Sequence, residues 1–84
     1  MTNIDTDMLS TALSSPVIKR SVMIAGHSTS VSLEQPFWDA LLHIAEHRQQ
    51  SLSDLISEID EARGTNLSSA LRLYVLFSLQ SNQP

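Results

Sequence analysis

Two histidines placed four residues apart are the pair in this sequence best suited to hold a metal ion. His43 and His47 fall in a stretch with helical periodicity, so both side chains would lie on one helix face. The chain has no cysteine, and Glu46 falls off the face that the histidines share. We therefore expect no metal site, and an exposed helix face at these positions.

A row of serines is the second candidate for chemistry. Ser28, Ser30 and Ser32 occupy alternate positions, so an extended chain presents their hydroxyls on one side. No histidine and aspartate stand in an arrangement that would activate a serine nucleophile, and so short a chain rarely encloses a deep pocket. We expect neither an enzyme nor a bound cofactor. The row is either a solvated strand face or a surface that meets a polar partner.

Charge is spread unevenly along the chain. The net charge of −4 is unlike that of most nucleic-acid-binding domains, which are basic. Residues 17–33 nevertheless contain Lys19 and Arg20 and no acidic residue, whereas residues 34–62 contain seven acidic residues and one basic residue, Arg48. The front of the chain is therefore mildly cationic, and oligomerisation would multiply that charge. Lys19 and Arg20 are either phosphate contacts or a solubilising pair.

Length and composition indicate one small domain that needs help to complete its core. The chain has 84 residues, of which 42% are hydrophobic, and chains of this size often bury part of their apolar surface against a partner subunit. No apolar run approaches the roughly 18 residues of a membrane span, and the start lacks the features of a signal peptide. We expect a cytoplasmic protein with a flexible segment at residues 1–17 and a domain at residues 18–80.

A β-hairpin is expected before the helices. Val22 and Ile24 alternate with other residues, and Gly26 suits the first position of a two-residue type II′ turn completed by His27. A loop at these two residues pairs position 24 with 29, 22 with 31 and 20 with 33. This register places the apolar residues of both strands on one face and the serines on the other.

Three helices are expected after the hairpin. Residues 34–50 have an apolar stripe at helical spacing, with Pro36 in the first turn. Residues 51–63 follow with Ser51 as N-cap, and residues 66–80 follow with an asparagine cap. The last helix is apolar around much of its circumference, which suggests that it packs against more than its own domain, as in a dimer.

The order of one short β segment and amphipathic helices resembles the ribbon–helix–helix family of bacterial DNA-binding proteins. TSVSLE corresponds to the ribbon strand, QPFWDALLHIAEHRQQ to the first helix and SLSDLISEID to the second. The combination of KRSV, GH, TSVSLE, FW and RGTNLSSA looks like one short bacterial branch of the family, over about residues 19–76. The resemblance implies a mainly α fold with a short β ribbon, an intertwined homodimer and an extra C-terminal helix.

The resemblance also implies roles for particular residues. In the family, the outer face of the ribbon enters the DNA major groove, and the N-terminus of the second helix anchors a phosphate. The base-facing residues are then Ser28, Ser30 and Ser32. The phosphate-facing residues are Lys19, Arg20, Ser51, Leu52 and Ser53. The dimer core is then formed by Val31, Leu33, Phe37, Trp38, Leu41, Ile56 and Tyr74.

Two hypotheses about function stay open on these grounds. The first is a dimeric DNA-binding protein that regulates transcription. The second is a protein-interaction or dimerisation module, or an antitoxin-like binder of a partner protein, with weak or no DNA reading. Residues 19–25 decide between these two hypotheses. If they form a hairpin with the following strand, a dimer has a sheet of four strands spaced roughly 4.8 Å apart, which is broad for a groove about 12 Å wide. Either this segment is an arm that moves aside, or the sheet meets DNA in another manner.

Overall fold

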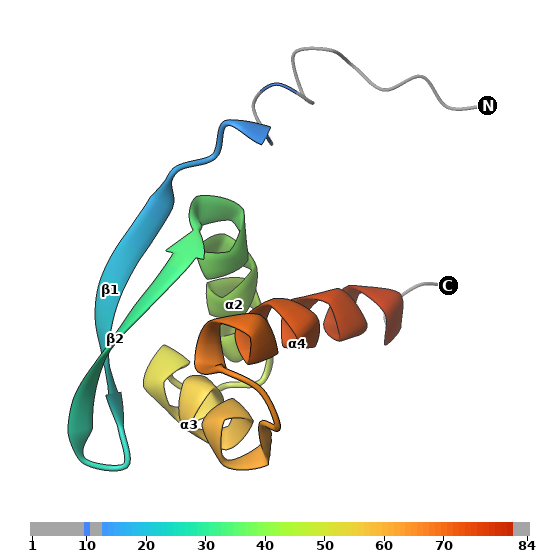
Figure 1. Cartoon of the computed structure of the whole chain (residues 1–84). Coiled ribbons are helices and arrows are strands. Elements are labelled where there is room, and N and C mark those ends of the chain that lie inside the picture. The colour runs from blue at the N-terminus through green and yellow to red at the C-terminus, as the bar shows by residue number, and fades with distance from the viewer. Residues whose placement is uncertain (1–9, 11–12, 82–84) are drawn as a thin grey trace.

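The computed structural model describes Ser10 and residues 13–81, so most of the segment predicted to be flexible, residues 1–17, lies outside the described residues. The elements are β1 (Val17–Ile24), β2 (His27–Glu34), α2 (Gln35–His47), α3 (Leu52–Ala62) and α4 (Leu67–Ser81). Figure 1 shows the β1–β2 hairpin along one side of the helices, with α4 leading away from them. The predicted two-stranded ribbon, two helices and extra C-terminal helix are therefore confirmed.

The turn of the hairpin lies one residue earlier than the sequence predicted. Ile24 pairs with His27, so the loop is Ala25-Gly26 and the predicted loop at Gly26-His27 is wrong. The two loop residues have φ values of 50° and 82°, and a type I′ turn requires a positive φ at both positions. Gly26 is compatible with a type II′ turn at residues 26–27 and with a type I′ turn at residues 25–26, so the glycine alone does not locate the loop. The pairing moves by two residues, so the predicted division into two faces holds.

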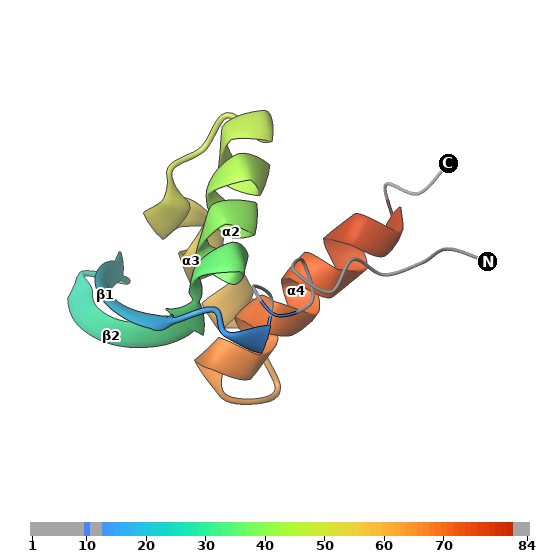
Figure 2. The same ribbon diagram turned by 90° about the horizontal axis from the view of Figure 1, so that it is seen from above.

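The core lies between the inner face of the hairpin and the three helices. β1 packs on α3, β2 packs on α2 and α4, and the helices pack on one another. Figure 2 shows the hairpin curving along one side of α2 and α3, while α4 leaves in a different direction from α2. The buried apolar residues are Val22, Ile24, Val31, Leu33, Trp38, Leu41, Ala45, Leu55, Ile56, Ile59, Ala70, Leu71 and Val75.

α2 ends in a left-handed turn at a residue that is not glycine. Gln49 has a φ of 55°, and its amide donates to the Glu46 carbonyl oxygen at 3.1 Å. The Gln50 amide donates to the Ala45 carbonyl oxygen at 3.0 Å, and the two bonds together form a Schellman motif. Glycine usually occupies the left-handed position because other residues are strained there. This tight stop leaves a short link between α2 and α3.

The predicted N-caps of the last two helices are confirmed. The Ser51 side-chain oxygen accepts a hydrogen bond from the Asp54 amide at 3.0 Å, which caps α3. The Asn66 side-chain oxygen accepts one from the Ser69 amide at 2.9 Å at the start of α4. Each cap satisfies an amide that the helix itself leaves without a partner.

Candidate nucleic-acid interface

The outer face of the hairpin, turned away from the helices, is polar along most of its length. Strand pairing brings Lys19 opposite Ser32, Ser21 opposite Ser30, and Met23 opposite Ser28. The Ser21 and Ser28 hydroxyl oxygens lie 2.6 Å apart and share a hydrogen bond across the two strands. The predicted serine row therefore lies on the side away from the core. We use "outer face" for these six residues.

Lys19 is the cation on this face, and no other residue in the described part of the chain neutralises it. The chain has five Lys and Arg residues, all of them described. The four arginines each contact a partner: Arg20 with Trp38, Arg48 with Tyr74 and Glu58, Arg63 with Asp60 and Thr65, and Arg72 with Glu34. Lys19 makes no hydrogen bond or ion pair with residues 13–81. Its charge is therefore available to a ligand.

Arg20 points to the opposite side of the sheet. It pairs with the buried Val31 on the inner face, and its guanidinium carbon lies 5.4 Å from the centroid of the Trp38 ring. The Trp38 Nε1 donates to the Ile18 carbonyl oxygen at 2.9 Å, so the same indole also holds the backbone of β1. The two neighbouring cations that the sequence groups together as phosphate contacts thus lie on different faces.

Residues 19–25 belong to the hairpin in this structure and do not form a separate arm. β1 pairs with β2 from Val17 to Ile24, and the side chains of Val22 and Ile24 are each only 7% exposed. Moving β1 aside would expose both of these side chains, at roughly 1.5–3 kcal/mol each. It would also break the bond between Trp38 and Ile18. The sheet that any ligand meets is therefore at least two strands wide in a single chain.

The second edge of β2 is open to another strand over part of its length. In an antiparallel pair of strands, residue pairs that share backbone hydrogen bonds alternate with pairs that do not. The pair that flanks the turn, Ile24 and His27, belongs to the hydrogen-bonded set. So does the pair at the other end, where the Gln35 amide donates to the Pro16 carbonyl oxygen. The backbone groups of Ser28, Ser30 and Ser32 therefore point away from β1. The Ser32 carbonyl accepts the Ser68 hydroxyl of α4 at 3.3 Å. Among the described residues, no strand other than β1 pairs with β2, so Ser28 and Ser30 offer an unpaired edge.

The N-terminus of α3 has less to offer an anion than the sequence suggested. The Ser51 hydroxyl is already engaged as the cap, and Leu52 and Ser53 are half-buried. The amides at Leu52 and Ser53 still belong to the first turn, where a helix leaves donors free. Asp54 places a carboxylate in the same turn, where it interacts with the helix dipole and repels a second anion.

The residues predicted for the dimer core contribute to the core of a single chain. Five of the seven are buried within one chain, namely Val31, Leu33, Trp38, Leu41 and Ile56. The other two, Phe37 and Tyr74, are partly buried and pack against that core. A partner subunit could add to this core only at its edge, and the shared core of an intertwined dimer stays a prediction.

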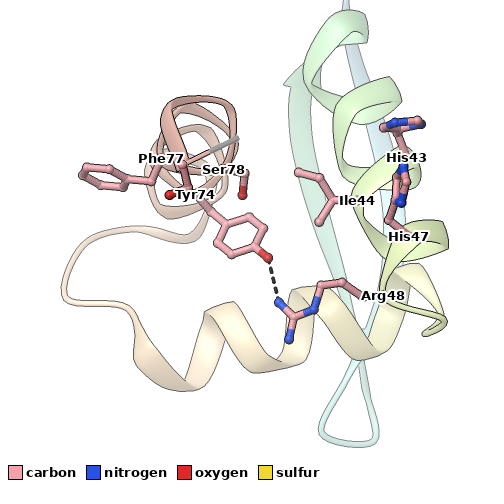
Figure 3. A pocket seen from close by; sticks show the side chains of 8 residues that line it. His43, Ile44, His47, Arg48, Tyr74, Phe77 and Ser78 are labelled. Carbon is pink, nitrogen blue, oxygen red and sulfur yellow. Dashed lines mark hydrogen bonds between the residues drawn. The ribbon is translucent and has the colours of Figure 1, made fainter. Parts of the chain in front are cut away.

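The two histidines lie along α2 beside an opening between α2 and α4. Their ring centroids are 4.8 Å apart, edge to face, and no group of three His, Cys, Asp or Glu side chains within residues 13–81 could hold a metal ion. Figure 3 shows Tyr74 reaching from α4 to Arg48, where a 2.8 Å hydrogen bond crosses one end of the opening. That hydrogen bond raises the pKa of Arg48 further, so this guanidinium stays charged. The opening has a volume of about 690 Å³.

One ion pair that ties α4 to the hairpin was not predicted from the sequence. The Arg72 Nε and Nη2 donate to the two carboxylate oxygens of Glu34 at 3.0 and 3.3 Å. The Arg72 guanidinium also lies 5.8 Å from the centroid of the Phe37 ring. The hydrogen bonds from Arg72 lower the pKa of Glu34. The partners are 38 residues apart, and no local spacing rule connects them.

A model of the ribbon-helix-helix domain family matches residues 17–79, from the start of β1 almost to the end of α4. The chain belongs to the ribbon-helix-helix family. Members of this family are typically DNA-binding transcription regulators or antitoxins, form dimers, and are generally not enzymes. No curated protein matches the chain. No helix within the described residues is long and apolar enough to cross a membrane.

A solved structure supports the assignment. The chain is similar to an uncharacterized protein from Bordetella pertussis Tohama I, with a TM-score of 0.71 and 30% sequence identity. The alignment covers 95% of this chain and 72% of that one. The likeness therefore extends over nearly the whole chain.

Proposed function

We propose that this protein is a dimeric, cytoplasmic DNA-binding protein that regulates transcription through the outer face of its hairpin. The observation that carries the proposal is Lys19, the single cation without a partner in residues 13–81, which lies on the serine-lined face. A cation beside hydroxyl groups suits phosphate oxygens, which accept hydrogen bonds from both. The typical role of the family supports the same conclusion.

The dimer forms by pairing of the two β2 strands at their free edges. Ser28 and Ser30 have outward-pointing backbone groups with no partner strand among the described residues. Antiparallel pairing with the same edge of a second chain, related by a two-fold axis, gives these backbone groups hydrogen-bond partners. The result is a four-stranded sheet with β2 of each chain at the centre and β1 of each chain at the margins.

Such a sheet is too wide to enter the major groove in the way a two-stranded ribbon does. Three spacings of roughly 4.8 Å separate the two outer strands by about 14 Å, against a groove width of about 12 Å. The sheet therefore lies across the groove. The two Lys19 side chains on the marginal strands then reach the phosphates on either side, while the central serines face the groove. Serine both donates and accepts hydrogen bonds, so base discrimination is weak.

The start of α3 supplies a second, weaker phosphate contact in this proposal. The free amides at Leu52 and Ser53 would bind the anion, as the family resemblance implies. Asp54 opposes that contact by like-charge repulsion. Replacement of Asp54 by Asn should therefore raise DNA affinity if a phosphate lies there, and should leave it unchanged if none does.

A fluorescence anisotropy titration of labelled genomic fragments over a range of salt concentrations tests the proposal. Lys19→Gln should weaken binding and reduce the slope of log K against log salt by about 2 per dimer, because two phosphate contacts are lost. Arg20→Gln is the matched control, since it removes the same charge from the adjacent residue on the opposite face.

Two outcomes would contradict the proposed contact. Absence of any salt-sensitive binding at micromolar protein would argue against DNA as the ligand. Equal losses for Lys19→Gln and Arg20→Gln would show that only net charge matters, or that both residues meet phosphates as the sequence alone predicted.

A second candidate function is protein interaction, including an antitoxin-like role with weak or no DNA reading. The net charge of −4 and the exposed apolar side chains near the end of α4 favour it. Affinity capture from cells, with the recovered DNA and protein both quantified, separates the two functions. Enrichment of one protein partner without DNA would favour this second function.

A further inference from the structure

The two halves of α4 lie in different surroundings. The first half is fixed to the body of the domain, where the Ser68 hydroxyl bonds the Ser32 carbonyl and Arg72 pairs with Glu34. Val75 is its last buried residue. Beyond it the helix continues for more than a turn and extends away from the other helices, as Figure 1 shows.

The exposed side of α4 is apolar and uncharged. Four large side chains are 46–59% exposed: Leu73, Leu76, Phe77 and Leu79. We call them the α4 patch. No charged residue occurs between positions 73 and 81, whereas α3 alone carries four acidic residues. Clustered exposed apolar side chains are uncommon on monomeric proteins and mark interaction surfaces.

Two hollows lie beside the patch at Phe77; Leu73 also lines the smaller one, whereas Leu76 and Leu79 line neither. One is the opening of about 690 Å³ between α2 and α4, and the other is a hollow of about 380 Å³ between α3 and α4. Tyr74 and Phe77 contribute to the walls of both. Figure 3 shows Phe77 pointing away from α2, and this side chain is 59% exposed. The smaller hollow is lined mainly by small or apolar side chains such as Ile59, Ala62 and Ala70, and also by Glu58 and Arg63, and its volume leaves room for a bulky ring.

A second copy of this chain is the occupant that fits these features best. The same surface carries both a projecting aromatic side chain and a hollow beside it, so two copies can exchange them around a two-fold axis. The protein is acidic, with a pI of about 5.0, and most approaches between two copies bring like charges together. The α4 patch has no charge to repel its own copy. It also has no cation to attract DNA.

We propose that the α4 patch is a self-association surface, at which α4 of a second copy packs and each Phe77 enters the hollow beside the other α4. This interface is separate from the β2 edge and does not depend on DNA binding. Chains that use both surfaces assemble beyond a dimer. Chains that use the α4 patch alone form a dimer that leaves the outer face of the hairpin open.

Analytical ultracentrifugation of the full chain and of variants tests the proposal. Leu73→Glu with Phe77→Glu should weaken self-association by roughly 100-fold or more, because each copy then buries two charges in an apolar interface. Leu42→Glu is the matched control, since Leu42 is 43% exposed, like Leu73 at 46%, but lies on α2 and, unlike Leu73, lines neither hollow. All these residues are exposed in the single chain, so the variants should fold, and circular dichroism checks that they do.

A third variant separates the two interfaces. Ser30→Pro blocks the free edge of β2, since proline lacks the outward-pointing amide that a second strand would need. Association that persists in Ser30→Pro and is lost in the α4 variant identifies the α4 patch. Association lost in Ser30→Pro but retained in the α4 variant overturns the proposal and leaves the β2 edge as the contact.

The salt dependence of self-association is an independent test of the α4 patch. Association through an uncharged apolar patch should hold or strengthen in sodium sulfate, in contrast to DNA binding. A wild-type protein that stays monomeric over the micromolar range overturns the proposal. So does a monomer whose α4 patch captures a different protein.

Discussion

The outer face of the hairpin and the α4 patch are both exposed, yet they differ in every property that decides what a surface binds. The outer face presents hydroxyls and one unpaired cation beside an open strand edge. The α4 patch presents leucines and a phenylalanine with no charge among them. A polyanion and a second strand suit the first surface, and an apolar helix suits the second.

One small chain can therefore separate two kinds of contact by physical chemistry alone. Binding that depends on phosphate contacts weakens as salt rises, because released counterions drive it. Binding that depends on apolar burial is insensitive to salt or strengthened by it. Mutations that weaken one surface should therefore leave the other unchanged.

Trp38→Phe should have the largest effect, and should act on the hairpin side of the molecule. The substitution removes the hydrogen bond from Nε1 to the Ile18 carbonyl and weakens the stacking of Arg20. Loss of a bond to a partly buried carbonyl, together with a smaller ring in a close-packed core, should lower the free energy of unfolding by about 2 kcal/mol. Urea unfolding followed by circular dichroism measures the change.

Arg20→Gln serves as the control for that experiment. It keeps the indole and its hydrogen bond and removes only the cation over the ring, so it should lower the free energy of unfolding by about 0.5 kcal/mol. In folded Trp38→Phe, DNA binding should weaken while association through the α4 patch persists. Parallel losses at both surfaces would show that the two surfaces are coupled through the core.

Gln49→Gly should have an intermediate and opposite effect on stability. Gln49 occupies a left-handed position at the end of α2, and glycine there should raise the free energy of unfolding by about 0.5–1 kcal/mol.

Gln50→Gly is the matched control, since Gln50 has no positive φ and its side chain bonds Glu58. That variant should lower stability by roughly 0.5–1 kcal/mol. Thermal unfolding checks both, and neither should change DNA binding or self-association. A loss of stability in Gln49→Gly would mean that side-chain contacts outweigh the backbone strain.

Local patterns in the sequence predict most of the fold. Alternation along the strands identifies the buried residues Val31 and Leu33. Caps such as Ser51 are local as well, because the donor lies only three residues away. The misplaced turn shows the limit, since one glycine suits two turn types and the choice depends on Ala25 accepting a positive φ.

Contacts between distant segments could not be predicted in the same way. Nothing at positions 19 and 20 indicates that Lys19 faces outward while Arg20 lies over Trp38, until β1 is paired with β2 in its actual register. The blocking of one end of the β2 edge by Ser68 depends on how α4 returns to the sheet. The candidate site is therefore visible in the sequence as a row of serines, but its single free cation is visible only in the structure.

The smallest expected effect concerns the ion pair that joins the two regions. Arg72 lowers the pKa of Glu34 below its usual value of 4.5, so the ionised carboxylate is favoured in the folded state. A lowered folded-state pKa stabilises the fold at pH values above 4.5, and this stabilisation is lost as the pH falls through the lower, folded-state value. The melting temperature of wild type should therefore exceed that of Glu34→Gln at neutral pH, and the gap should close below pH 4.5.

Glu61→Gln is the matched control, because Glu61 is exposed on α3 and has no ion pair within residues 13–81. Its melting temperature should follow that of wild type across the whole range. The ion pair connects the fixed half of α4 to the end of β2. Glu34→Gln therefore also tests whether the outer face and the α4 patch stay independent when that link is removed. Unchanged salt slopes for DNA binding and unchanged self-association in this variant would mean that each surface is set by its own element. A change in both would mean that the position of α4 on the hairpin governs them together.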